Sequence, residues 1–123
     1  MASFYLYFNA LLYAVFALWC TFAPAQTAKA VGYDALSRSG ESEYLVVYGG
    51  LQLGLALFFF YCARAGEQRI GLILALAVYV PIVLYRCITV ARQWPVSPTT
   101  LGTGLLEIAL LLGALAAWWR LRA

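Results

Sequence analysis

Residues 70–91 of this chain, IGLILALAVYVPIVLYRCITVA, decide the fold. The segment is long enough to cross the hydrocarbon core of a membrane as an α-helix, which takes about 20 apolar residues. Its one charged side chain is Arg86, close to its end. Three other segments have a similar length and apolar character, and the strands of a membrane barrel would be much shorter. We therefore predict an all-α polytopic membrane protein whose spans are residues 4–23, 44–63, 70–91 and 101–119.

The composition of the chain excludes an ordinary soluble domain. Of its 123 residues, 65% are hydrophobic and 11% are charged. A soluble domain of this size could not bury so much apolar surface, because small domains leave a large share of their surface exposed. The formal net charge of +3 suits contact with anionic headgroups but falls far short of a nucleic-acid-binding stripe. Membrane lipids are therefore the expected partners, and nucleic acid is not.

The reactive residue types leave little room for catalysis or metal binding. The chain has no histidine, which is the usual general base and the commonest metal and haem ligand. Its cysteines, Cys20, Cys62 and Cys87, form no C-x-x-C pair, and we interpret them as small apolar side chains. We expect no metal, no cofactor and no catalytic residue. An enzyme that uses Glu107 is an alternative that we rank low.

The connections between the spans predict how the helices are arranged. Residues 64–69 make a tight turn, and residues 92–100 make a short irregular connection. Short connections force neighbouring helices to run antiparallel, which gives an up-down-up-down four-helix bundle in a single domain, residues 1–123. The first connection, residues 26–43, is the longest, and we predict a short surface helix over residues 28–36.

Basic residues outside the spans predict the orientation in the membrane. Cytoplasmic segments of membrane proteins are enriched in lysine and arginine. Four basic residues lie on the side of the termini and three on the opposite side, so we expect both termini in the cytoplasm. The four are Arg64, Arg69, Arg120 and Arg122, and the three are Lys29, Arg38 and Arg92.

The leading candidates for function are Arg86 and Glu107, because charged residues inside apolar spans are costly and usually paired or functional. At ~1.5 Å rise per residue, both lie about 8–9 Å inside the outer boundary of their spans. Gln52 reaches a similar level, and Tyr48 lies one turn above it on the same face. We therefore predict one polar cluster of Tyr48, Gln52, Arg86 and Glu107 in the outer half of the bundle. Tyr79 lies on the face of Arg86, two turns deeper.

Two interpretations of the cluster remain open. The first is a structural ion pair that fixes the register and rotation of two helices. The second is a site for a ligand or an ion, which the position of the pair near one membrane surface favours. The two differ in one observable feature, because a clamp lies in a packed interior whereas a site opens into a cavity.

Small residues form two stripes at helical spacing. Gly50 and Gly54 match the small-xxx-small pattern that lets helices approach closely. Ala109, Gly113 and Ala117 form a similar stripe, which points away from Glu107 on the same helix. We interpret both as helix-packing surfaces, and the second stripe is alternatively the face of a homodimer.

The segment EYLVVYGGLQL, residues 43–53, carries a resemblance to a known family. Together with Arg86 near the end of the third span and Glu107 in the fourth, it resembles domain-of-unknown-function family 4345, small four-helix membrane proteins of bacteria. The resemblance covers essentially the whole chain and implies a multi-pass protein of the bacterial inner membrane. This chain departs from the family pattern before Tyr-Gly-Gly, where it has Glu43 and Tyr44 instead of a basic residue. The family brings no assigned activity.

The function that fits these observations best is binding of a lipid, quinone or similar amphiphile. In this hypothesis Arg86 meets an anionic or carbonyl head, Glu107 orients Arg86, and Tyr48 and Gln52 supply hydrogen bonds. One alternative is an accessory subunit of a larger membrane complex. Another is a small dimeric exporter. It ranks lower because small four-helix exporters place their key glutamate in the first span, where this chain has only Asn9.

Overall fold

The computed structural model describes residues 1–34 and 37–122, and every regular element in these ranges is a helix. A π-helical turn, η1, joins α3 to α4, so that residues 38–65 form one continuous helix. The elements are α1 (Ala2–Phe22), α2 (Pro24–Ala30), α3 (Arg38–Tyr44), η1 (Leu45–Leu51), α4 (Gln52–Ala65), α5 (Gln68–Gln93) and α6 (Pro98–Arg122).

The prediction of an all-α fold with four membrane-length helices is confirmed. The helices that are long and apolar enough to cross a membrane are Ala2–Phe22, Arg38–Ala65, Gln68–Gln93 and Pro98–Arg122. Three predicted spans lie inside these helices, and the first exceeds α1 by one residue, Ala23. Ala23 leaves the helical conformation because it precedes Pro24, whose ring disfavours a helical residue before it.

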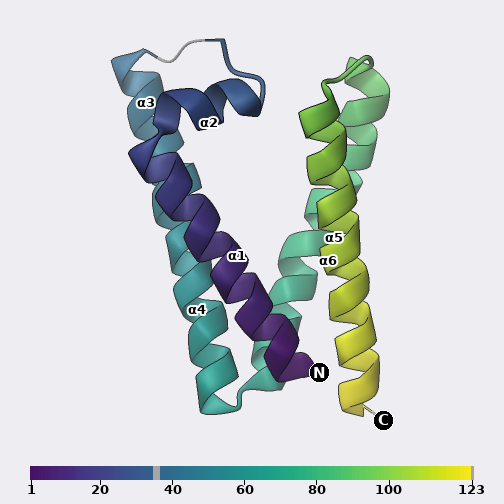
Figure 1. The fold of residues 1–123 in the computed structure, drawn as a ribbon. Helices are drawn as coiled ribbons and strands as arrows, with labels where there is room; N and C mark the ends of the chain where they lie inside the picture. The colour runs from purple at the N-terminus through teal and green to yellow at the C-terminus, as the bar shows by residue number, and fades with distance from the viewer. Residues whose placement is uncertain (35–36, 123) are drawn as a thin grey trace.

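The four long helices are arranged as two pairs. In the first helix pair α1 packs against η1 and α4, and in the second helix pair α5 packs against α6. Figure 1 shows that the two pairs meet at the end that holds both termini and the α4–α5 turn. The pairs diverge toward the other end, where α2, α3 and the α5–α6 connection lie. We call these the closed end and the open end.

The closed end is held by a core that both pairs share. Leu6 of α1, Phe59 of α4 and Leu72 of α5 are fully buried in one cluster, which Ala114 of α6 joins. A Cβ on Gly71 would lie 2.8 Å from the Leu6 side chain, so this glycine allows α1 and α5 to come close together. Such close packing supplies the association energy of helices in a lipid environment.

At the open end, the short surface helix occupies a different segment from the predicted one. We predicted residues 28–36, whereas α2 runs from Pro24 to Ala30 and residues 31–34 are not helical. Residues 35–36 lie outside the described part of the chain. Proline favours the first helical position because its fixed φ suits the helix and its missing N–H needs no partner there, which explains the earlier start.

Candidate functional site

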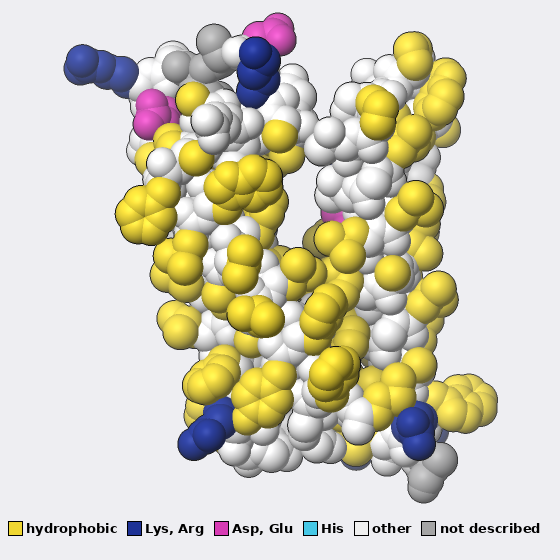
Figure 2. All heavy atoms as spheres, viewed as in Figure 1, with side chains coloured by type: hydrophobic (Ala, Val, Ile, Leu, Met, Phe, Trp, Pro, Cys, Tyr) yellow, Lys and Arg dark blue, Asp and Glu magenta, His cyan; other side chains and the backbone are white. Residues whose placement is uncertain are grey.

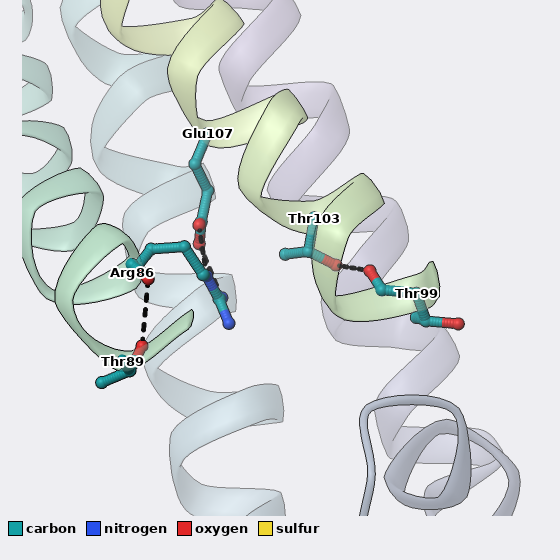
Figure 3. Close-up of polar contacts among 5 residues, drawn as sticks. All are labelled: Arg86, Thr89, Thr99, Thr103 and Glu107. Carbon is teal, nitrogen blue, oxygen red and sulfur yellow. Dashed lines mark hydrogen bonds and ion pairs between the residues drawn. The ribbon is translucent and has the colours of Figure 1, made fainter. Parts of the chain in front are cut away.

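The structure brings Arg86 of α5 and Glu107 of α6 into direct contact. Arg86 Nε donates to Glu107 Oε1 at 2.8 Å, and Arg86 Nη2 donates to Glu107 Oε2 at 3.1 Å. Figure 3 shows the two side chains reaching toward each other between their helices. Two parallel N–H···O bonds make this a bidentate pair, which fixes the guanidinium in orientation as well as in position.

Gly104 supports the pair, and the sequence analysis did not identify it. A Cβ at this position would lie 3.3 Å from Cγ and 3.7 Å from Cδ of Arg86, so the stem of the arginine lies directly against the backbone of α6. Gly104 precedes Glu107 by less than one helical turn, and that spacing is the sequence signal that could have revealed it.

The pair lines a cleft of about 400 Å³ between the two helix pairs. Figure 2 shows the hollow that separates the pairs toward the open end. Its volume falls within the range of about 300–1,000 Å³ that is usual for small-molecule sites. The first helix pair contributes Leu12, Tyr13, Phe16, Val47, Tyr48 and Gln52, and the second contributes Ile82, Arg86, Thr100, Thr103, Leu106 and Glu107.

Tyr48 and Gln52 lie on the wall that faces the ion pair, not in contact with it. The Tyr48 ring stacks on Tyr44 with a centroid distance of 4.5 Å and also packs against Phe16. All four residues of the predicted cluster therefore line one cleft, and the divergence of the helix pairs at this level separates them into two walls.

Tyr48 and Gln52 share one wall because residues four apart align along a helix, and the π-helical turn η1 keeps this alignment. A π turn closes i→i+5 hydrogen bonds and holds more residues than an α turn, so residues four apart lie close to one line along the helix. Tyr44, Tyr48 and Gln52 have this spacing. On another side of the same turn, a Cβ on Gly49 would lie 2.8 Å from Thr21 Oγ1, which shows how closely η1 approaches α1.

A chain of hydrogen bonds closes the cleft on the side of the closed end. The Tyr79 hydroxyl donates to Asn9 Oδ1, and Asn9 Nδ2 donates to the Tyr5 carbonyl at 2.9 Å. The Tyr5 hydroxyl donates to the Leu110 carbonyl at 2.6 Å. Tyr79 and Leu110 also line the cleft, so this chain ties α1 to α5 and α6 where the two helix pairs separate.

The predicted packing residues lie in different surroundings. Among the described residues, a Cβ on Gly50 or Gly54 would meet no atom within 4 Å, so both glycines lie on an open face of the first helix pair. On α6, a Cβ on Gly113 would lie 2.9 Å from the Tyr5 ring, and Ala117 is buried, whereas Ala109 is exposed. The stripe on α6 therefore faces α1 over part of its length.

No group of three or more histidine, cysteine, aspartate or glutamate residues that could hold a metal ion occurs in residues 1–34 and 37–122. In comparisons with known proteins, no family model, no curated protein and no solved structure matches this chain.

Proposed function

We propose that this protein binds a membrane amphiphile, such as a lipid or a quinone, in the cleft between its two helix pairs. The observation that carries the proposal is that the bidentate Arg86–Glu107 pair lines a cleft of about 400 Å³ and is not enclosed in packed side chains. An ion pair that served only as a clamp would need no free volume beside it.

The donors that remain on Arg86 suit the head of such a ligand. A guanidinium group has five N–H donors, and Glu107 engages only two of them. The Arg86 side chain is 33% exposed and the Glu107 side chain 15%, so a ligand in the cleft meets the arginine first. Tyr48 and Gln52 offer further polar groups from the opposite wall.

Apolar residues along the same cleft suit the chain of the ligand. Phe16 and Val47 lie on one wall, and Ile82 and Leu106 lie on the other. Ligand sites usually combine a mostly apolar lining with a few polar groups that fix the orientation of the ligand.

We further propose that the four long helices cross the bacterial inner membrane in up-down-up-down order, with both termini in the cytoplasm. The helix lengths of 21 to 28 residues and the excess of basic residues at the closed end support this orientation. In this orientation the cleft lies in the outer half of the membrane. A fluorescent or phosphatase reporter fused after Arg122 tests it, and phosphatase activity at this position would reverse the assignment.

Filling the cleft tests the binding proposal. Val47→Trp places a large side chain in the cleft but leaves Arg86 and Glu107 unchanged, so the variant should lose its co-purifying amphiphile. Val46→Trp is the matched control, because Val46 is 63% exposed and does not line the cleft. Mass spectrometry of lipids extracted from each purified protein measures the difference. Equal retention by the two variants, or none by the unaltered protein, would refute the proposal.

An accessory subunit of a larger membrane complex is a second candidate function. The open face around Gly50 and Gly54 favours it, because a small-xxx-small face without a neighbour within the chain can receive a helix of another protein. Gly54→Leu should then release a partner during purification in mild detergent, whereas Gly102→Leu, at another open position, should not. Recovery of the unaltered protein without any partner would count against this role.

A further inference from the structure

We infer that the ligand of the cleft is an uncharged amphiphile whose head offers carbonyl or hydroxyl oxygens, and that Glu107 excludes anionic heads. The inference rests on the proposed binding function and specifies its ligand class. Ester carbonyls of an uncharged glycerolipid and the carbonyls of a prenyl quinone share this chemistry.

The charges that line the cleft balance each other. Arg86 and Glu107 are the only charged residues among the described residues that line it. The carboxylate lies 2.8 Å from the guanidinium, so the two charges cancel at the site. An anionic head that approached Arg86 would be attracted by the arginine and repelled by the nearby carboxylate. It would also give up part of its hydration, which is costly for a charged group.

The geometry of the ion pair is fixed by contacts on both sides of Arg86. Glu107 engages both Nε and Nη2, and Gly104 seats the stem of Arg86 against α6. For a phosphate to take up the Nε/Nη2 edge of Arg86, it would have to displace a carboxylate that already holds this edge. The outer Nη1/Nη2 edge keeps the three remaining N–H donors for carbonyl oxygens, and because Glu107 already balances the charge of Arg86, a phosphate gains less at this edge than it would from an unpaired arginine.

Uncharged polar groups also line the cleft. Thr103 donates its hydroxyl hydrogen to the Thr99 carbonyl at 2.9 Å, and its oxygen keeps lone pairs that can accept. With Tyr48 and Gln52, this gives the cleft both donors and acceptors, and no second cation lies among its described lining residues. Such a set matches a head that carries both hydroxyl and carbonyl groups.

Competition between two lipids with identical chains, together with a prenyl quinone, tests the inference. The protein in detergent micelles is offered dioleoylglycerol, dioleoylphosphatidic acid and a prenyl quinone at equal concentrations, and native mass spectrometry counts each bound species. We expect one of the two uncharged ligands to be bound at least about tenfold more tightly than phosphatidic acid, and the favoured one identifies the source of the carbonyl. Equal or tighter binding of phosphatidic acid would overturn the inference and leave the proposed function intact. Retention of none of the three would refute the proposed function itself.

The variant Glu107→Gln tests directly whether Glu107 excludes anionic heads. The substitution keeps the size of the side chain and leaves Arg86 with an uncompensated positive charge, so the preference should shift toward phosphatidic acid by about tenfold or more. Glu67→Gln, which removes the same charge from an exposed position at the α4–α5 turn, is the matched control and should not change the preference. An unchanged preference in Glu107→Gln would contradict the role of Glu107.

If Glu107→Gln does not fold, the double variant Arg86→Gln with Glu107→Gln serves instead. It leaves the cleft without charge, so it should retain the preference for uncharged ligands while losing affinity for all of them. Binding of phosphatidic acid in preference to dioleoylglycerol by this variant would contradict the inference as well.

Discussion

The two ends of the molecule are built from the same four helices but differ in how the helix pairs meet. At the closed end, aromatic and aliphatic side chains from both pairs share one buried core, and glycine allows α1 and α5 to approach closely. At the open end, each pair keeps its own contacts, and polar residues face each other across a cleft. We expect the closed end to carry most of the stability and, under the proposed function, the open end to contact the ligand, and each expectation can be tested separately.

The largest effect is expected from Phe59→Ala in the shared core. Phe59 is fully buried and stacks with Tyr13 at a centroid distance of 5.8 Å. Removing its ring leaves a cavity, and we expect a loss of about 3 kcal/mol in the free energy of unfolding. Phe58→Ala, at a position that is 40% exposed, is the control and should cost far less. Unfolding in mixed detergent micelles with rising dodecyl sulfate measures both, and equal losses would contradict a core that is specific to the closed end.

Arg86→Gln should have the next largest effect on stability. It leaves the Glu107 carboxylate, which is 15% exposed, without its partner, and we expect a loss of about 2 kcal/mol, since breaking a partly buried pair costs less than breaking a fully buried one. Adding Glu107→Gln should recover most of the loss. A double-mutant cycle on the same unfolding assay measures the coupling, and additive effects would show that the pair contributes no interaction energy.

Tyr79→Phe should have a smaller effect, at the boundary between the two regions. The substitution removes the hydroxyl that donates to Asn9 and leaves the amide oxygen of Asn9 unpartnered, for an expected cost of about 1 kcal/mol. Tyr85→Phe is the control, because Tyr85 is exposed on α5. Hydrogen exchange of the α1 and α5 amides should rise in Tyr79→Phe alone, and unchanged exchange would argue that the bond does not join the two helix pairs.

The smallest effects are expected from alanine at two of the glycines. Gly113→Ala brings a Cβ to 2.9 Å from the Tyr5 ring and should cost about 1 kcal/mol through the shift of that ring. Gly50→Ala meets no neighbour and should be neutral or slightly stabilising, because alanine favours the helix over glycine by up to about 1 kcal/mol. The reverse order of stability would mean that Gly50 is covered by a partner and Gly113 is not.

The number of long helices and the level of the charged residues could be predicted from the sequence, because both follow from the length of apolar runs and the rise of a helix. Counting residues along the spans placed Arg86 and Glu107 at one depth, and the two side chains are in contact. The separation of Tyr48 and Gln52 from that pair was not predictable, because it depends on the angle between helix pairs. That angle results from contacts such as Leu6 with Gly71, whose partners are far apart in the sequence.

Local features escaped the sequence analysis for a different reason. No characteristic sequence pattern marks the π turn at residues 45–51, because its apolar residues and glycines also suit an ordinary α-helix. Gly104 resembles any other small residue in an apolar helix, and only the position of the Arg86 stem gives it a role. The shift of α2 to Pro24–Ala30, in contrast, followed a proline signal that was present in the sequence.

The division into two helix pairs also bears on how the chain is assembled during synthesis. Each pair consists of consecutive long helices, so most contacts of α1 are complete once residue 65 has emerged, and those of α5 once α6 has followed. The hydrogen bonds of Tyr79 with Asn9 and of Tyr5 with Leu110 join residues from the two halves and can form only afterwards. In the proposed topology, the ribosome would therefore release two helical hairpins in turn, and the final step would be their docking side by side.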